Sequence, residues 1–193
     1  MAILSREQIE AMGFAEVGKN ARLSDKASYY NCPRIRIGDN VRIDDFCVLS
    51  AGAGGIEIGS YIHIAVYSSL IGAGRISVRD FSNISSRVSI YSSSDDYSGA
   101  SMTNPMVPCR YTQVTHADVE IGRHVIIGSG SVVLPGVILE EGVAIGALSL
   151  VNQNCRTFCI YAGTPARFLR ERKRDLLALE ERMLADQASL PID

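Results

Sequence analysis

Tryptophan is absent from this chain, and aromatic residues of all kinds make up only 7% of it. A core without large rings must be filled by aliphatic side chains in narrow, repetitive layers. The sequence also lacks an apolar stretch long enough to span a bilayer, and it contains no C-x-x-C pair of the kind that builds zinc ribbons. Its net charge is only −2, so we expect no nucleic-acid partner and no membrane insertion.

The cysteines argue against a disulfide scaffold. There are five of them, an odd number, which suits a protein kept in a reducing compartment. The first 14 residues have neither the basic start nor the apolar run of a signal peptide. We therefore expect a cytoplasmic protein.

A six-residue period dominates what the sequence does contain. From Ile121 it reads IGRHVI-IGSGSV-VLPGVI-LEEGVA-IGALSL. A helix needs a period of 3.6 residues and a plain strand a period of two, so neither explains the repeat. A short strand followed by a corner, with one large inward side chain per side, does explain it.

Upstream, the same period comes in groups of three aliphatic or aromatic positions, which predicts one triangular coil per group. Steps of eight or nine residues separate the groups, and a step of 31 residues separates Ile90 from Ile121, so we expect a long loop there. The inward positions of the six predicted coils are Val17, Leu23 and Tyr29; Ile37, Ile43 and Leu49; Ile58, Ile64 and Leu70; Val78, Ile84 and Ile90; Ile121, Ile127 and Val133; and Leu139, Ile145 and Val151.

The repeat divides the chain into three parts. Residues 17–156 form an all-β parallel β-helix of about six coils, with an inserted loop over 96–118. Residues 1–16 form a helical cap, where the S-x-x-Q pattern from Ser5 to Gln8 is a capping box and Gly13 can end the helix. Residues 157–193 form a turn and a C-terminal helix over 166–186.

Two stretches resemble the hexapeptide-repeat acyltransferases, in particular the galactoside, maltose and xenobiotic acetyltransferases. They are VEIGRHVIIGSGSVVLPGVILEEGVAIGALSLV, residues 119–151, and IYAGTPARFLR, residues 160–170. The resemblance implies a left-handed β-helix, an exception to the right-handed crossover rule. It also implies acetyl-CoA as co-substrate and a homotrimer with active sites between subunits.

Acyl transfer to a hydroxyl requires a base, and histidine is the usual one at neutral pH. In the resembling enzymes the catalytic histidine lies where the chain leaves the prism for the long loop. Here that position holds Asp95, followed by Asp96, while His116 lies at the returning end of the loop. Asp95 could orient His116 as the base, Asp95 could itself be the base, or an amine acceptor could make a protein base unnecessary.

The other two histidines are weaker candidates. His63 is expected to point outward at a corner, where it could face the groove of a neighbouring subunit. His124 is predicted to point outward from the middle of a prism side, so we expect it to have a packing or surface role. An alternative interpretation of the Asp95–Asp96 run is a turn whose side chains cap their own backbone.

Small outward residues predict where CoA would lie. Small side chains on adjacent coils let a pantetheine arm approach the backbone, and guanidinium groups suit CoA phosphates. Five of the eight residues from Arg167 to Arg174 are basic. The candidate CoA-binding residues are Ser129, Gly146, Ala147, Asn152, Gln153, Thr164, Pro165, Arg167 and Arg170.

The main functional hypothesis is an O-acetyltransferase acting on a sugar or polysaccharide hydroxyl. An alternative is N-acetylation of a nucleotide-linked amino sugar, which the missing family histidine favours. Hypotheses of other classes are a zinc enzyme like the hexapeptide-repeat carbonic anhydrases and a non-catalytic trimer. The three histidines do not have the spacing of that zinc family, so no metal site is predicted.

Overall fold

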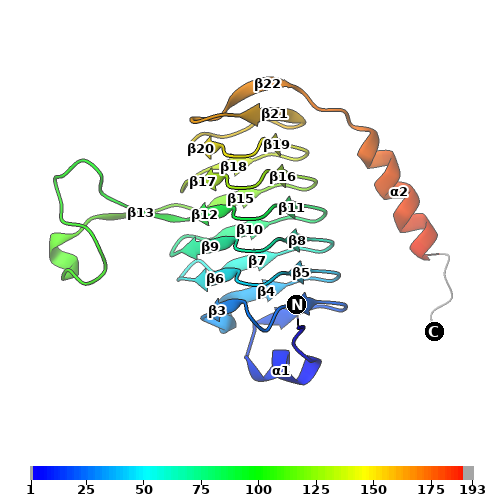
Figure 1. Cartoon of the computed structure of the whole chain (residues 1–193), viewed down its shortest axis with the longest axis horizontal. Coiled ribbons are helices and arrows are strands. Elements are labelled where there is room, and N and C mark those ends of the chain that lie inside the picture. The colour runs from blue at the N-terminus through cyan, green and yellow to red at the C-terminus, as the bar shows by residue number, and fades with distance from the viewer. Residues whose placement is uncertain (1, 189–193) are drawn as a thin grey trace.

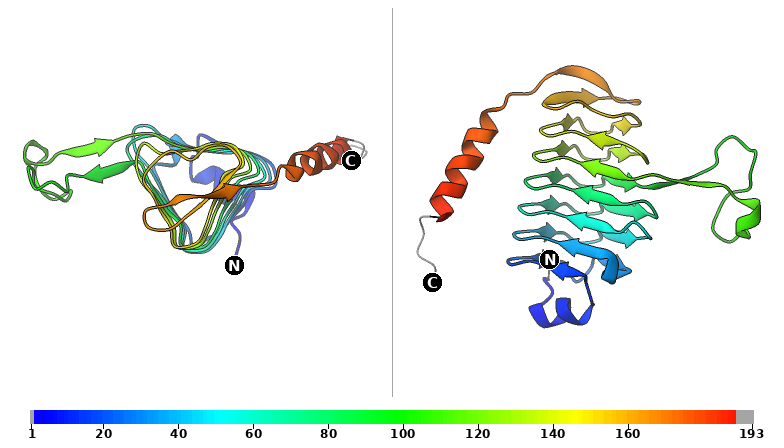
Figure 2. Two further views of the ribbon diagram at one scale, coloured as in Figure 1. Left: turned by 90° about the horizontal axis from the view of Figure 1, so that it is seen from above. Right: turned by 180° about the vertical axis from the view of Figure 1, so that it is seen from behind.

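The body of the protein is a three-sided prism of stacked coils, as the computed structural model of residues 2–188 shows (Figure 1). The prism is a left-handed β-helix of about seven turns. The view from above shows the triangular outline, with one long arm leaving one corner and a helix beside another (Figure 2). The predicted fold class is therefore confirmed, with one turn more than the six expected.

Each face of the prism is a sheet of short strands, and the strands of the body pair in parallel. The first sheet contains β1 (Glu16–Val17), β4 (Ile35–Ile37), β7 (Ile56–Ile58), β10 (Ile76–Val78), β15 (Val119–Ile121) and β18 (Ile138–Leu139). The second contains β2 (Arg22–Leu23), β5 (Arg42–Ile43), β8 (His63–Ile64), β11 (Asn83–Ile84), β16 (Ile126–Ile127), β19 (Ala144–Ile145), β21 (Cys159–Ala162) and β22 (Arg167–Glu171). The third contains β3 (Ser28–Tyr30), β6 (Val48–Ala51), β9 (Ser69–Gly72), β12 (Ser89–Tyr91), β17 (Val132–Val133) and β20 (Leu150–Val151).

The predicted inward positions form the core. Of the 18, only Val17 and Tyr29, both in the first coil, are not fully buried. The strand register places aliphatic residues of successive coils on top of one another. Val78, for example, pairs with Ile58 below it and with Ile121 above it. The 31-residue step between Ile90 and Ile121 therefore leaves the coil stack unbroken.

Two corners of the prism are tight turns that require a left-handed backbone conformation. At the corner between the first and second sheets, here called the helix corner, Tyr61, Phe81 and His124 have φ values of 58°, 61° and 57°. At the corner between the second and third sheets, here called the small-residue corner, Tyr67 and Leu148 have φ values of 63° and 57°. Large residues rarely adopt this conformation, and here the ladders on both sides of each turn hold them in it.

The N-terminal helix behaves as predicted. In α1 (Arg6–Ala11), Ser5 accepts a hydrogen bond from the backbone of Gln8, and the Gln8 side chain accepts one from the backbone of Ser5. Ile9 is buried against the first coil, so the helix covers the open end of the core (Figure 1).

The C-terminal part differs from the expectation of one helix over 166–186. The stack continues past residue 156, because β21 pairs in parallel with β19. The chain then reverses into β22, which pairs antiparallel with β21, and α2 (Asp175–Ala188) begins only after that. The short 3-10 turns η1 (Cys32–Arg34) and η2 (Cys109–Tyr111) complete the elements of the described chain. No helix in residues 2–188 is long and apolar enough to cross a membrane.

The buried aliphatic residues of successive coils stack in columns inside the prism. We therefore expect the stability of the protein to depend steeply on the volume of these side chains. Ile84 is 0% exposed in a central coil, so Ile84→Ala should lower the free energy of unfolding by about 2–5 kcal/mol. Ile138, on the outer surface of the first sheet, is 39% exposed, and Ile138→Ala is the matched control with an expected loss below about 1 kcal/mol. Urea unfolding of the two variants measures the difference, and equal losses would contradict the column model.

Candidate functional site

A two-stranded arm stands out from the prism at the corner between the third and first sheets (Figure 2). Its strands β13 (Ser93–Asp95) and β14 (Val114–His116) pair antiparallel, with Ser93 opposite His116 and Asp95 opposite Val114. The two ends of the long loop therefore lie side by side. The excursion begins and ends a few residues earlier than the expected loop over 96–118.

His116 and Asp95 do not form the dyad considered from the sequence. The arm register places Ser93, not Asp95, directly opposite His116, and the Ser93 hydroxyl lies 2.8 Å from His116 Nδ1. Asp95 lies opposite Val114, and the carboxylate of Asp95 has no hydrogen-bond or ion-pair partner among residues 2–188. Asp95 is exposed and free to interact with a ligand.

Asp95 lies beside the largest cavity described at the arm. The volume of this cavity is about 500 Å³. It lies between the arm and β9, and its lining is mostly apolar outside the serines and Asp95. The lining residues are Ile71, Ser93, Ser94, Asp95, Asn104, Pro105, Val107, Cys109, Thr112 and Val114.

Asp96 has a local role instead. Its two carboxylate oxygens accept hydrogen bonds from the backbone N–H groups of Ser98 and Ser101, at 2.8 and 3.0 Å. Hydrogen bonds from Ser98, and then those from Ser101, lower the pKa of Asp96. These contacts match the self-capping turn that was the alternative interpretation of this run.

His63 lies on the outer surface of the second sheet, in β8, and not at a corner as expected from the sequence, because the turn is made at Tyr61. There it binds a neighbouring carboxylate. Its Nε2 lies 2.9 Å from Asp44 Oδ2, and Arg42 Nε donates to the other oxygen of Asp44 at 2.7 Å. Partial burial opposes ionisation of Asp44, but the hydrogen bonds from His63 and Arg42 outweigh it and lower the pKa of Asp44. His63 is thus engaged within its own protomer, on a face open to a neighbour.

His124 packs at the helix corner rather than mid-side. It is 9% exposed, stacks on Phe81, and its Nε2 lies 2.7 Å from Glu180 Oε2 on α2. Arg172, which the sequence analysis did not single out, donates to the backbone oxygens of His124 and Gly142 at 2.8 and 2.9 Å. Burial lowers the pKa of Arg172. His124 and Arg172 therefore serve to attach the C-terminal segment.

The candidate CoA-binding residues divide between two corners. Ser129, Ala147 and Thr164 lie on successive coils at the small-residue corner, where Thr164 Oγ1 donates to the backbone oxygen of Leu148 at 3.3 Å. Gly146 and Pro165 belong to the same corner. Asn152 and Gln153 instead follow β20 at the corner from which the arm leaves. The Gln153 side chain nevertheless donates to the backbone oxygen of Ala166 at 3.4 Å, between Pro165 and Arg167, whereas Asn152 makes no such contact.

The two candidate phosphate-binding arginines lie on β22 above this corner. Every residue of β22 is exposed. Arg167 donates to the backbone oxygen of Ala166 at 3.1 Å. The guanidinium of Arg170 has no partner in the described part of the chain.

The histidines do not assemble into a metal site. Each has a different partner, Asp44, Ser93 or Glu180. Among residues 2–188 there is no group of three or more His, Cys, Asp or Glu side chains that could hold a metal ion.

Comparison with known proteins extends the resemblance to almost the whole chain. The family model described as bacterial transferase hexapeptide (six repeats) matches residues 118–153. The dTDP-4-amino-4,6-dideoxy-D-glucose acyltransferase of Escherichia coli is 59% identical over 180 residues, which cover 93% of this chain and 94% of that protein.

Solved structures agree with this relationship. AntD, an N-acyltransferase from Bacillus cereus crystallised with dTDP and 3-hydroxybutyryl-CoA, superimposes with a TM-score of 0.92 at 44% identity, covering 97% of this chain and 98% of that chain. A maltose O-acetyltransferase from Clostridium difficile shares 20% identity over 88% of this chain and 75% of its own, with a TM-score of 0.59, which shows a common fold alone. The chain belongs to the hexapeptide-repeat sugar acyltransferases, and its co-substrate is an acyl-CoA.

Proposed function

We propose that this protein transfers an acyl group from acyl-CoA to the amino group of a dTDP-linked 4-amino-4,6-dideoxy sugar. The single observation that carries the proposal is the free carboxylate of Asp95 at the position where the O-acetyltransferases have a histidine. The whole-length similarity to the E. coli acyltransferase and to AntD supports this acceptor. The main hypothesis from the sequence was O-acetylation of a hydroxyl. The proposal replaces it by the alternative, acylation of the amino group of a nucleotide-linked sugar.

An amine acceptor suits a carboxylate better than a hydroxyl acceptor does. A sugar hydroxyl must lose its proton to attack a thioester, which calls for a base such as histidine. An amine near the α-amino pKa of about 8 is already partly neutral at pH 7. It needs only to be held in place and to lose one proton as the C–N bond forms.

In the proposed reaction the amine nitrogen attacks the thioester carbonyl carbon, and the C–S bond breaks. Asp95 accepts a hydrogen bond from the amine and takes its proton as the bond forms. The proton then passes to the sulfur, so that CoA leaves as a free thiol and the sugar carries an amide. His116, bonded to Ser93, holds that hydroxyl beside the site without taking the proton. His63, bonded to Asp44, lies on the second sheet, away from the arm of its own protomer.

CoA would lie along the small-residue corner. The coils stack closely at Gly128 and Ala147, where a Cβ on Gly128 would be 2.5 Å from the Ala147 nitrogen, so no larger residue fits at Gly128. Arg167 and Arg170 would hold the CoA phosphates. Asn152 and Gln153, at another corner, are left out of this proposal.

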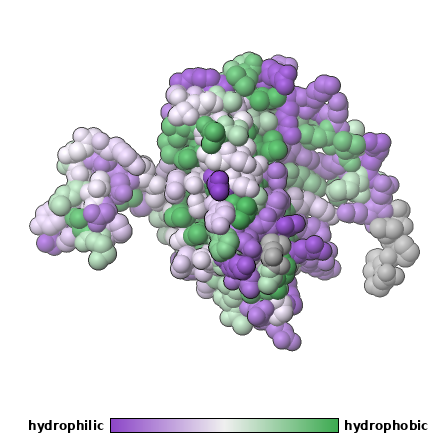
Figure 3. Space-filling model, in the orientation of Figure 1, coloured by the Kyte–Doolittle hydropathy of each residue, from purple (hydrophilic) through white to green (hydrophobic). Residues whose placement is uncertain are grey.

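We further propose a homotrimer in the cytoplasm. Strand β14 of the arm is exposed along its length and β13 is half-buried at Ser93 and Ser94. An isolated hairpin is marginally stable in water, so a neighbouring subunit would support the arm. Hydrophobic residues lie on the prism surface between arm and α2 (Figure 3). Ile126 and Val132 are half-buried outward residues on the second and third sheets. All five cysteines are free thiols, which suits a reducing compartment.

The first prediction from this proposal separates Asp95 from His116. Asp95→Ala and Asp95→Asn should lower kcat by roughly 10²–10⁴-fold, because both remove the proton acceptor. His116→Ala should keep most of the activity, because it removes only a partner of Ser93. Turnover is measured as release of CoA thiol with the dTDP-linked amino sugar. If Asp95→Asn is fully active while His116→Ala or His63→Ala is dead, a histidine is the base and the assignment is wrong.

A second prediction concerns CoA affinity. Arg167→Ala combined with Arg170→Ala should raise the dissociation constant for CoA by at least about tenfold, because each charge-assisted contact contributes about 1.5–3 kcal/mol. Lys173→Ala removes an exposed cation just beyond β22 and is the matched control. Calorimetric titration with CoA measures the change. Equal affinities of the double variant and the control would remove the phosphate-binding role.

A third prediction concerns assembly. Sedimentation equilibrium should give a mass three times that of the 20.9 kDa protomer. Ile126→Arg should lower the mass, because it places a charge on the proposed contact surface. Ile138→Arg, on the first sheet, should leave it unchanged. A stable monomer of the unaltered protein at micromolar concentration would exclude the trimer.

A further inference from the structure

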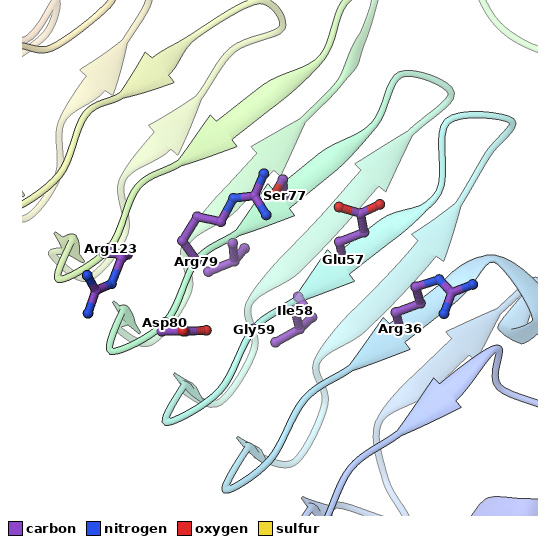
Figure 4. Close-up of a pocket in the computed structure, with 9 residues that line it drawn as sticks. Arg36, Glu57, Ile58, Gly59, Ser77, Arg79, Asp80 and Arg123 are labelled. Atoms are coloured by element: carbon purple, nitrogen blue, oxygen red, sulfur yellow. The ribbon is translucent and has the colours of Figure 1, made fainter. Parts of the chain in front are cut away.

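A hollow in the outer surface of the first sheet, near the helix corner, has a volume of about 290 Å³ (Figure 4). It shares no lining residue with the cavity at the arm. Its polar lining residues are Arg36, Glu57, Ser77, Arg79, Asp80 and Arg123. Within one protomer it is therefore separate from the cavity beside Asp95.

Arg79 interrupts a column of glycines at this hollow. The residue that follows the first-sheet strand is Gly18, Gly38, Gly59 and Gly122 in four of the other coils, but it is Arg79 in the coil of β10. In Figure 4 the Arg79 side chain extends across the hollow toward Ser77. The stacking of the coils does not require a long side chain here, since neighbouring coils manage without one.

The Arg79 guanidinium has no partner in residues 2–188, unlike the other two arginines of the hollow. Arg36 is paired with Glu16 at 2.9 Å, and Arg123 is paired with Glu180 on α2. A guanidinium offers five N–H donors in a planar fork, the arrangement that carboxylate and phosphate oxygens match. Arg79 is thus a cation with unused donors, in a hollow that also holds the carboxylate of Asp80, which has no ion-pair partner in the described chain.

Ser77 supplies a second unsatisfied donor. It is 1% exposed although it points outward from β10, and its hydroxyl has no hydrogen-bond partner in the described chain. Its two register neighbours, Glu120 and Glu57, both face Arg75, at 3.0 and 4.0 Å. Buried hydroxyls are normally hydrogen-bonded, so an unpartnered one beside a free guanidinium calls for an explanation.

We propose that this hollow binds a small molecule through a carboxylate or phosphate group. Arg79 would donate two hydrogen bonds to the oxyanion, and movement of its side chain onto the ligand would uncover the Ser77 hydroxyl as a third donor. Glu57 and Asp80 at the rim would accept hydrogen bonds from ligand hydroxyls, which favours a hydroxylated anion. One Asp80 oxygen already accepts the backbone N–H of Ser60 at 2.7 Å, so the other oxygen is the available one.

The test uses the intact protein saturated with CoA, so that the arginines of β22 are occupied. Inorganic phosphate and acetate are titrated calorimetrically against a sodium chloride control of equal ionic strength. Arg79→Gly, which restores the residue of the neighbouring coils, should weaken binding of the preferred anion by at least about tenfold. Ser77→Ala should weaken it by about two- to tenfold. The tighter of the two anions identifies the ligand group as phosphate or carboxylate.

Arg22→Gly is the matched control, because Arg22 is an exposed arginine of the first coil outside the hollow, and it should bind the anion as the unaltered protein does. Three results would overturn the proposal. One is that neither anion binds the unaltered protein. Another is that Arg79→Gly binds as tightly as Arg22→Gly. The third is a reduced sedimentation mass of Arg79→Gly, which would assign Arg79 to a subunit contact.

Discussion

Everything in this molecule depends on the alignment of each coil with the coils above and below it. One aliphatic side chain per side points inward, and the parallel ladders carry the same register through the body of the prism. A slip by one residue would turn the aliphatic side chains to solvent, so the six-residue period is enforced. Close stacking also explains part of the glycine content: a Cβ on Gly38 would lie 2.7 Å from the backbone oxygen of Gly59 in the next coil.

Because the interior is filled by aliphatic columns, chemistry is confined to the outer faces, the corners and the arm. The three histidines illustrate this, since each lies outside the core and is held by a nearby side chain. Asp95, on the arm, has a carboxylate without such a partner in the described chain. The small-residue corner leads upward to Arg167 and Arg170 on β22. Acyl donor and amine acceptor would meet where arm and corners of adjacent subunits come together.

Six of the about seven coils could be predicted from the sequence, because a period of six leaves little freedom once one aliphatic residue per side must be buried. The sites were harder to predict, for physical reasons that differ between residues. Pairing of His116 with Ser93 depends on the register of an exposed hairpin, which no buried pattern specifies. The strand β22 before α2 could not be predicted, because its basic, leucine-containing sequence suits a helix equally well. By contrast, the position of Asn152 and Gln153 at a different corner from Ser129 follows from counting sides of the triangle, and the sequence already held that information.

The most direct test of the account is a competition between acceptors. The protein would be supplied with acyl-CoA and equal concentrations of dTDP-4-amino-4,6-dideoxyglucose and a hydroxyl acceptor such as maltose, and the products identified by mass spectrometry before and after treatment with hydroxylamine. The account predicts one product, an amide on the amino sugar that resists hydroxylamine. A hydroxylamine-sensitive ester on the hydroxyl acceptor, with the amino sugar left unmodified, would contradict it.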